Sequence, residues 1–201
     1  MSEAIIRPAT VADAPYMTQC HIECLAETYA HIMPPAFAQQ RRDRFRAEVD
    51  ELVVQLVEAE QAEAADRKPV RRHWLAELDG EVVGVAASGP GVAPWELEYF
   101  SNPEPPVGFN LDHLYTRART HGSGLGPRML ATALARPGSD EPLAAWLWIM
   151  RENPRAEAFY RRHGFVDDDL DGRLPGALEV DCGPTWFHRP MFRMWRPGAD
   201  T

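Results

Sequence analysis

The sequence contains few cysteines, and this excludes a whole class of small proteins. Its 201 residues include three, Cys20, Cys24 and Cys182, which is too few and an odd number for a disulfide framework. His21 lies between the first two, but a metal site would need more ligands and a second cluster. We therefore expect ordinary thiols that pack as small apolar groups, and no bound metal.

Positive charge and long apolar runs are also scarce. The net charge is −9, with 21 Lys and Arg against 30 Asp and Glu, whereas general nucleic-acid binding needs a strong basic field. No apolar run is long enough to cross a bilayer, and "MSEAIIRPAT" lacks the charged start and apolar core of a signal peptide. We expect a cytoplasmic protein with no nucleic-acid or membrane partner.

The first third of the chain predicts mostly helix. A short strand in "AIIRPAT" ends at Pro8, and "VADAPYMTQCHIECLAETYAHIM" then has helical spacing. Pro34 and Pro35 end this helix. In "FAQQRRDRFRAEVDELVVQLVEAEQAEAA" apolar residues recur at steps of three and four, which predicts one long amphipathic helix or a broken one.

The remainder predicts a sheet interleaved with helices. "HWLAELDGEVVGVAAS" reads as two strands joined at Asp79-Gly80, a strong hairpin signal. Strands and helices then alternate through "FNLDHLYT", "PRMLATALAR", "LAAWLWIM", "NPRAEAFYRRHGF" and a strand that begins at Phe165. We expect a last strand in "TWFHRPMFRMWR", interrupted by Pro190. This order predicts a layered α/β (α+β) fold whose mixed sheet has at least one parallel pair.

Three glycines precede one of these helices in "RTHGSGLGPRML". Gly122, Gly124 and Gly126 allow a ligand to approach the backbone, and Pro127 suits a first helical turn. A helix N-terminus has unpaired N–H groups and partial positive charge, so this stretch suits a phosphate. A flexible strand-to-helix turn explains it equally well in isolation. A P-loop or a dinucleotide fingerprint would need different residues or spacing.

A second motif, "NPRAEAFYRRHGF", adds to this evidence. Asn153 and Tyr160 are seven residues apart, so they fall on nearly the same face of a helix. The small Ala156 between them leaves room for a ligand along that face. The alternative is an amphipathic helix with a half-buried tyrosine.

Together these motifs resemble the GNAT superfamily of N-acetyltransferases. "LYTRARTHGSGLGPRML" is similar to the acetyl-CoA loop (Gln/Arg)-x-x-Gly-x-(Gly/Ala), and "NPRAEAFYRRHGF" is similar to the later helix Asn-x-x-Ala-x-x-Phe-Tyr-x-x-x-Gly-Phe. The resemblance implies one domain over residues 1–201, with a cofactor core at about 110–166 and a helical acceptor-side region at about 10–66. It also implies a mostly antiparallel sheet with helices on both faces and a splayed parallel strand pair at the cofactor site.

The resemblance further implies acetyl-CoA as co-substrate and no metal. Backbone N–H groups from Gly122 to Gly126 would hold the pyrophosphate, and Leu114 and Thr116 would pair with the pantetheine arm. Asn153 would hydrogen-bond that arm, and Tyr160 would protonate the leaving thiolate as general acid. The cofactor-binding residues implied in this way are Leu114, Tyr115, Thr116, His121, Gly122, Ser123, Gly124, Leu125, Gly126, Asn153 and Tyr160.

The acceptor side is less well defined. The attacking amine must lose a proton, and the candidate bases are Asp112, Glu96, Glu98 or a water relay. Residues that would line an apolar or cationic amine site are Tyr29, His31, Phe37, Trp95, Tyr99 and Phe100. Ordinary core packing is the alternative for each aromatic residue, and a solvated surface position for each carboxylate.

One position departs from the family pattern, because His121 stands where Gln or Arg is usual. Its backbone N–H would still serve the phosphate. We expect an N-acetyltransferase that acts on a primary amine of a small molecule or peptide. The alternative is a catalytically silent GNAT-like acyl-CoA-binding regulatory module. A homodimer is a further expectation from the resemblance.

Overall fold

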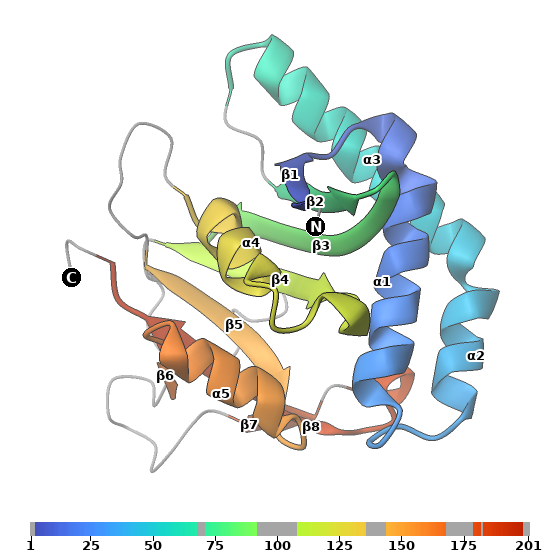
Figure 1. Cartoon of the computed structure of the whole chain (residues 1–201), viewed down its shortest axis with the longest axis vertical. Coiled ribbons are helices and arrows are strands. Elements are labelled where there is room, and N and C mark those ends of the chain that lie inside the picture. Colours follow the sequence, from blue (N-terminus) through green and yellow to red (C-terminus); the bar gives the residue numbers. More distant parts are fainter. Residues whose placement is uncertain are drawn as a thin grey trace. The chain divides into compact units, whose positions relative to one another are not determined.

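The computed structural model describes residues 3–67, 71–91, 108–135, 144–167, 179–181 and 183–198 (Figure 1). The chain forms two compact units, one of Met1–Gly89 with His113–Ala133 and one of Pro90–Asp112 with Leu134–Thr201. Strand β4 (Phe109–Thr116) contributes its first half to the second unit and its second half to the first. None of the described helices combines the length and the apolar composition needed to cross a membrane.

The strands of the first unit lie side by side in chain order, and the β1–β2 and β2–β3 pairs are antiparallel. They are β1 (Ile5–Pro8), β2 (Arg72–Leu78) and β3 (Glu81–Pro90), and the second half of β4 comes next in the order. Ile5 lies opposite Glu77 in the β1–β2 pair. Asp79 and Gly80 connect β2 to β3 with φ of 52° and 83°, as a two-residue hairpin turn requires. The predicted hairpin is confirmed.

The helices of the first unit are α1 (Ala14–Tyr29), α2 (Ala36–Asp43), α3 (Phe45–Ala64) and α4 (Leu125–Ala133). Short 3-10 turns at Val11–Asp13 and Ala118–Thr120 precede α1 and α4. The segment predicted as one long or broken helix is broken, at Arg44. Helices α1 and α3 pack side by side in Figure 1.

Helices cover both faces of the first unit's sheet. Met17 and Cys20 of α1 pack with Leu75 of β2. On β3, a Cβ added to Gly84 would meet Met129 of α4 at 2.5 Å from Sδ. Ala76, the strand neighbour of Leu75, lies 3.3 Å from that same Cβ. Because neighbouring residues in a strand point to opposite faces, α1 covers one face and α4 the other.

The second unit contains the parallel pair. Its elements are β5 (Ala145–Met150), α5 (Pro154–Arg162), β6 (Val166–Asp167), β7 (Glu179–Asp181) and β8 (Pro190–Arg196). The strand order is β4-β5-β8-β6, and β7 also pairs with β8. Among the strand pairs described in this unit, β4–β5 is parallel, with Phe109 opposite Ala145 and Asn110 opposite Trp146, and the pairs of β8 with β5, β6 and β7 are antiparallel. A ladder this short fits the splayed pair expected, and the predicted mixed, mostly antiparallel fold is confirmed.

The last predicted strand is wrong in its first half. Residues Pro184–Trp186 form a 3-10 turn, and both Phe187 and His188 adopt φ of 54°, which no strand allows. Pro190 begins β8 instead of interrupting it. A proline has no N–H to donate to the sheet, so the first residue of a strand is one of the few positions that tolerate it.

Candidate functional site

The glycine loop, residues 117–124, connects β4 to α4. Gly122 and Gly124 have φ of 82° and 84°, a left-handed conformation that other residues adopt at a cost. A Cβ at either position would meet no atom within 4 Å. Conformation therefore favours glycine here, while the space beside the backbone is open to a ligand.

Hydrogen bonding in the loop alternates from residue to residue. The N–H of His121 donates to Ala118 O at 3.1 Å, and that of Ser123 donates to Thr120 O at 3.2 Å. Within the described part of the chain, the N–H groups of Gly122 and Gly124 donate to no protein acceptor. The glycines therefore present the donors that an anion needs.

Two predicted loop residues lie in the helix. α4 begins at Leu125, so Gly126 belongs to its first turn. The Leu125 N–H lies 3.4 Å from Ser123 Oγ, which itself donates to Thr120 O at 2.7 Å. Ser123 is therefore engaged within the loop. Leu125 and Gly126 add the start of a helix, with its partial positive charge, to the glycine N–H groups.

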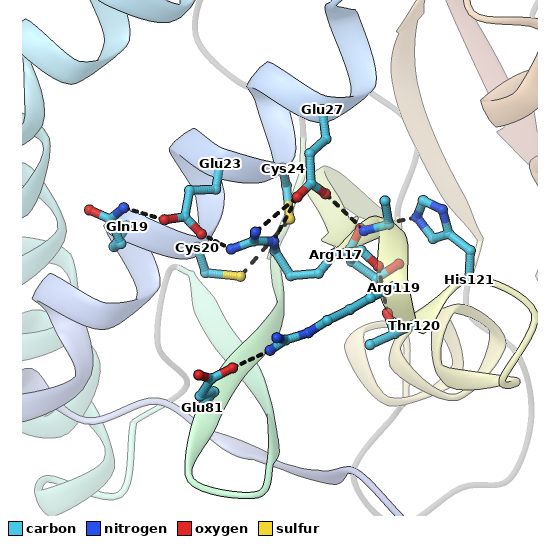
Figure 2. A network of polar contacts seen from close by, with 12 residues as sticks. Gln19, Cys20, Glu23, Cys24, Glu27, Glu81, Arg117, Arg119, Thr120 and His121 are labelled. Atoms are coloured by element: carbon cyan, nitrogen blue, oxygen red, sulfur yellow. Dashed lines mark hydrogen bonds and ion pairs between the residues drawn. The ribbon is translucent and has the colours of Figure 1, made fainter.

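Two carboxylates of α1 fix the start of the loop (Figure 2). Glu27 accepts a hydrogen bond from Arg117 Nε at 3.0 Å and one from the Ala118 N–H at 2.8 Å. Glu23 forms an ion pair with the same guanidinium. The Arg117 N–H donates to Val83 O of β3 at 2.8 Å. Both a helix and a strand therefore hold the backbone just before the glycines.

His121 does not replace the usual Gln or Arg in the way expected. Its backbone N–H is used within the 3-10 turn, as described above. The exposed ring lies with Nε2 3.1 Å from Thr116 O, at the end of β4. His121 therefore helps to shape the loop and uses its own N–H there, whereas the N–H of the neighbouring Gly122 donates to no acceptor in the described part of the chain.

The second half of β4 has two distinct faces. Tyr115 points toward α1, where its hydroxyl lies 3.1 Å from that of Tyr29. Since side chains alternate along a strand, Leu114 and Thr116 point to the opposite face. All three are partly buried.

In the second unit, Tyr160 lies in α5 as predicted, and Asn153 stands directly before the first residue of that helix. Asn153 is the N-cap of α5, and its Oδ1 accepts the Ala156 N–H at 3.1 Å. An Asn before a proline at the first helical position is a typical cap signal, which the sequence contained. Tyr160 is 7% exposed, with its ring edge-on to Phe159 and Phe165. Tyr160 is therefore more deeply buried than the half-buried tyrosine of the alternative interpretation.

The acceptor-side candidates divide into three groups. Tyr29 and Phe37 are buried and pack edge-to-face at 6.1 Å, which matches ordinary core packing, whereas His31 is exposed. Asp112 is partly buried in β4. The candidates outside the described residues are Trp95, Glu96, Glu98, Tyr99 and Phe100.

Sequence reasoning missed one group of titratable residues. His21 of α1 and His113 of β4 stack with ring centroids 4.6 Å apart. A positive charge on His73 of β2 would lower the pKa of His113. We call these three residues the histidine cluster. Among the described residues, no group of three or more His, Cys, Asp or Glu is arranged to hold a metal ion. The sequence signal for this group was weak: His73 lies two residues before the apolar Leu75, so the two side chains share one face of a strand.

Comparison with known proteins gives a family. Residues 69–167 match the Acetyltransferase (GNAT) domain. A probable N-acetyltransferase of Mycobacterium tuberculosis is 30% identical over 101 residues, which make up 50% of this chain and 48% of that protein. The chain thus spans about half the length of this curated relative.

Solved structures share the fold along nearly the whole chain. PaiA N-acetyltransferase from Thermoplasma acidophilum, in complex with coenzyme A, has a TM-score of 0.66 at 16% identity, over 98% of this chain and 99% of that one. The histone acetyltransferase HPA2 and related acetyltransferase from Corynebacterium glutamicum has a TM-score of 0.57 at 24% identity, over 98% of each chain. At such identities the likeness establishes the fold alone.

Proposed function

Because the chain belongs to the GNAT acetyltransferase family, we propose that it transfers an acetyl group from acetyl-CoA to a primary amine. The acceptor would be a small molecule or a peptide. The observation that carries the proposal is the pair of unused N–H groups at Gly122 and Gly124, directly before α4. A pyrophosphate is the part of acetyl-CoA that such donors recognise.

The loop and β4 would bind acetyl-CoA in the first unit. The glycine N–H groups and the start of α4 would hold the pyrophosphate, while Glu27 and Arg117 keep the loop in place. Backbone groups of Leu114 and Thr116 would pair with the pantetheine arm. One backbone N–H in this stretch would stabilise the oxyanion that forms on the thioester carbonyl.

The reaction needs two proton transfers. The amine nitrogen attacks the thioester carbon, so a C–N bond forms, the nitrogen loses a proton and the C–S bond breaks. The family resemblance assigns protonation of the leaving thiolate to Tyr160 and a hydrogen bond to the arm to Asn153, both of which belong to the second unit. Asp112, Glu96 and Glu98 are the carboxylate candidates for the base.

The first experiment measures thiol release from acetyl-CoA with a panel of primary amines, alongside acetyl-CoA binding by calorimetry. We expect turnover with at least one amine. Tight binding without turnover of any amine or peptide would instead favour the regulatory module. A cytoplasmic location, a single domain over residues 1–201 and a homodimer stay predictions.

Tyr160→Phe tests the proposed acid. We expect kcat to fall about 100-fold, the scale of general acid catalysis, while the acetyl-CoA Kd changes little because the ring and its packing remain. Tyr16→Phe is the matched control, since Tyr16 is 67% exposed on α1 and should leave both quantities unchanged. Equal loss of kcat and affinity in Tyr160→Phe would contradict the acid role.

A further inference from the structure

Two free thiols lie on successive turns of α1 in the first unit. Cys20 and Cys24 are four residues apart, and their Sγ atoms are 3.9 Å from each other. The side chains are 2% and 0% exposed and pack with Met17 and Leu75. The thiols therefore pack as small apolar groups, as expected, and this packing brings the two sulfur atoms into direct contact.

The two thiols differ in their readiness to ionise. The hydrogen bond from Cys24 lowers the pKa of Cys20. The positive charges of Arg117 and Arg119 also lower it, and together these effects outweigh burial and the negative charge of Glu27. The same hydrogen bond, together with burial, raises the pKa of Cys24. Cys20 is therefore the nucleophile of the pair, and Cys24 keeps its proton.

The same turns of α1 hold the glycine loop (Figure 2). Glu23 lies between the two cysteines in the sequence, and Glu27 lies three residues beyond Cys24, so all four side chains share one face of the helix. Glu23 forms an ion pair with Arg117, and Glu27 accepts a hydrogen bond from the same guanidinium. A change in the turn between the cysteines therefore reaches the loop through Glu23.

We propose that Cys20 and Cys24 are an oxidation site, at which hydrogen peroxide or another hydroperoxide closes a disulfide and so loosens the glycine loop. The formation of the disulfide depends on the thiols alone. The expected effect on acetyl-CoA binding rests on the proposed acetyltransferase function.

The reaction has two steps. The Cys20 thiolate attacks one peroxide oxygen, the O–O bond breaks, hydroxide leaves, and Cys20 becomes a sulfenic acid. The Cys24 sulfur then attacks that of Cys20, so the S–S bond forms, the S–O bond breaks, and water leaves with the Cys24 proton. The pair of thiols loses two electrons in all, and the peroxide gains them and ends as water.

Closing the bond changes the turn between the two cysteines. Residues four apart in an α-helix have Cα atoms about 6 Å apart, which lies within the range of a disulfide. The sulfur atoms must approach from 3.9 Å to about 2.0 Å, and this draws residues 20 and 24 together. Glu23 belongs to this turn, so its ion pair with Arg117 weakens.

Burial sets the rate of the oxidation. Both thiols are almost inaccessible to solvent, so a peroxide, which is little larger than water, reaches Cys20 when α1 opens locally. If the disulfide weakens acetyl-CoA binding, bound acetyl-CoA must disfavour the disulfide by the same factor. We therefore expect acetyl-CoA to slow the oxidation.

Treatment of the full chain with hydrogen peroxide tests the site, in a Cys182→Ser background that removes the third cysteine. Mass spectrometry should show that the peptide with both remaining cysteines has lost two hydrogen atoms, and a reducing thiol should restore them. Calorimetry should show the acetyl-CoA Kd rising about tenfold on oxidation and returning on reduction. Hydrogen exchange of the Ala118 N–H, which donates to Glu27, should become faster and report the looser loop without acetyl-CoA.

Cys24→Ser is the matched control, because it keeps the size of the side chain and cannot close the disulfide. Peroxide should leave a sulfenic acid on its Cys20, which dimedone traps, and the Kd should change by no more than about twofold. Cys20→Ser should react far more slowly, because the pKa of the remaining thiol is raised. Alanine at either position serves if a buried hydroxyl prevents folding.

Three results would overturn the inference. The first is the absence of a disulfide under conditions that oxidise the same chain in urea. The second is a disulfide that leaves both the acetyl-CoA Kd and the Ala118 exchange unchanged, and the third is equal reaction of Cys20→Ser and Cys24→Ser. A reduced protein that does not bind acetyl-CoA would instead overturn the proposed function, while the mass spectra and the exchange rates still decide the oxidation site.

Discussion

Helix α1 supports two regions of the first unit that differ in almost every physical respect. The glycine loop is exposed, held by ion pairs to Glu23 and Glu27, and rich in backbone donors. The histidine cluster is packed and uncharged, with cations as its charged surroundings. Anion binding benefits from exposed donors and fixed positive potential, whereas the buried imidazoles stay neutral because water is excluded from them. One helix supplies both environments from side chains within two turns, His21 for the cluster and Glu23 and Glu27 for the loop.

The largest expected difference between the two regions is in their response to acid. The folded protein keeps the His21 and His73 rings neutral down to a pKa of about 4, whereas their ordinary pKa is 6.5. Between these values the unfolded chain binds more protons, so the free energy of unfolding falls as the pH falls. We expect a loss on the order of 1–2 kcal/mol per ring between pH 7 and pH 5, measured by urea denaturation.

His73→Leu isolates this contribution from that of the carboxylates. The imidazole of His73 makes no hydrogen bond in the described residues, so an apolar side chain should cost little at pH 7. The variant should lose less stability than the wild type between pH 7 and pH 5. Identical losses in both proteins would show that His73 is not held neutral by the fold.

Gly124→Ala tests the loop at its most constrained point. A φ of 84° costs a non-glycine residue roughly 1–2 kcal/mol, and relaxation of the loop would turn the Gly124 N–H away. We expect acetyl-CoA affinity to fall about tenfold, measured by calorimetry. Gly80→Ala is the matched control, because Gly80 has a φ of 83° and equally open space in the β2–β3 turn. It should lose similar stability and keep the affinity, and a shared loss of affinity would contradict a specific role of the loop.

The smallest expected effect is the difference between Glu27 and Glu81, two carboxylates that pair with arginines of the loop. Glu27 also accepts the Ala118 N–H, so Glu27→Gln should weaken acetyl-CoA binding about threefold through a looser loop. Glu81 pairs only with Arg119 among the described contacts, and both side chains are more than half exposed. Glu81→Gln should therefore change neither binding nor thermal stability. Equal effects of the two substitutions would show that the hydrogen bond from the Ala118 N–H to Glu27 adds nothing to acetyl-CoA binding.

Local signals in the sequence predicted the framework well. The hairpin at Asp79-Gly80 and the strand 109–116 depended on turn chemistry and alternation, and the structure has both. The glycines at 122 and 124 have the conformation that their residue type permits. The prediction placed Asn153 on a helix face because it relied on the seven-residue spacing between Asn153 and Tyr160. The proline that follows Asn153, which marks a helix cap, was given less weight. Gly126 was placed in the loop because Pro127 was taken as the first residue of the helix.

The histidine cluster lay beyond sequence reasoning for a physical reason. His21, His73 and His113 come from a helix and two strands separated by about 50 and 40 residues. No periodicity connects them, and only tertiary packing brings α1 across β2 and β4. Their neutrality depends on the burial that this packing creates, and a sequence does not display burial for a polar residue.

The turn at Asp79-Gly80 has a consequence for the order of folding. Both residues already prefer the left-handed conformation that the turn needs, and β2 and β3 pair across only two intervening residues. Loop closure is therefore cheap, and a hairpin of this kind forms within microseconds. The β1–β2 pair, by contrast, joins Ile5 to Glu77 and has to close a loop of about 70 residues. We expect β2–β3 to serve as the early template on which the N-terminal strand docks late.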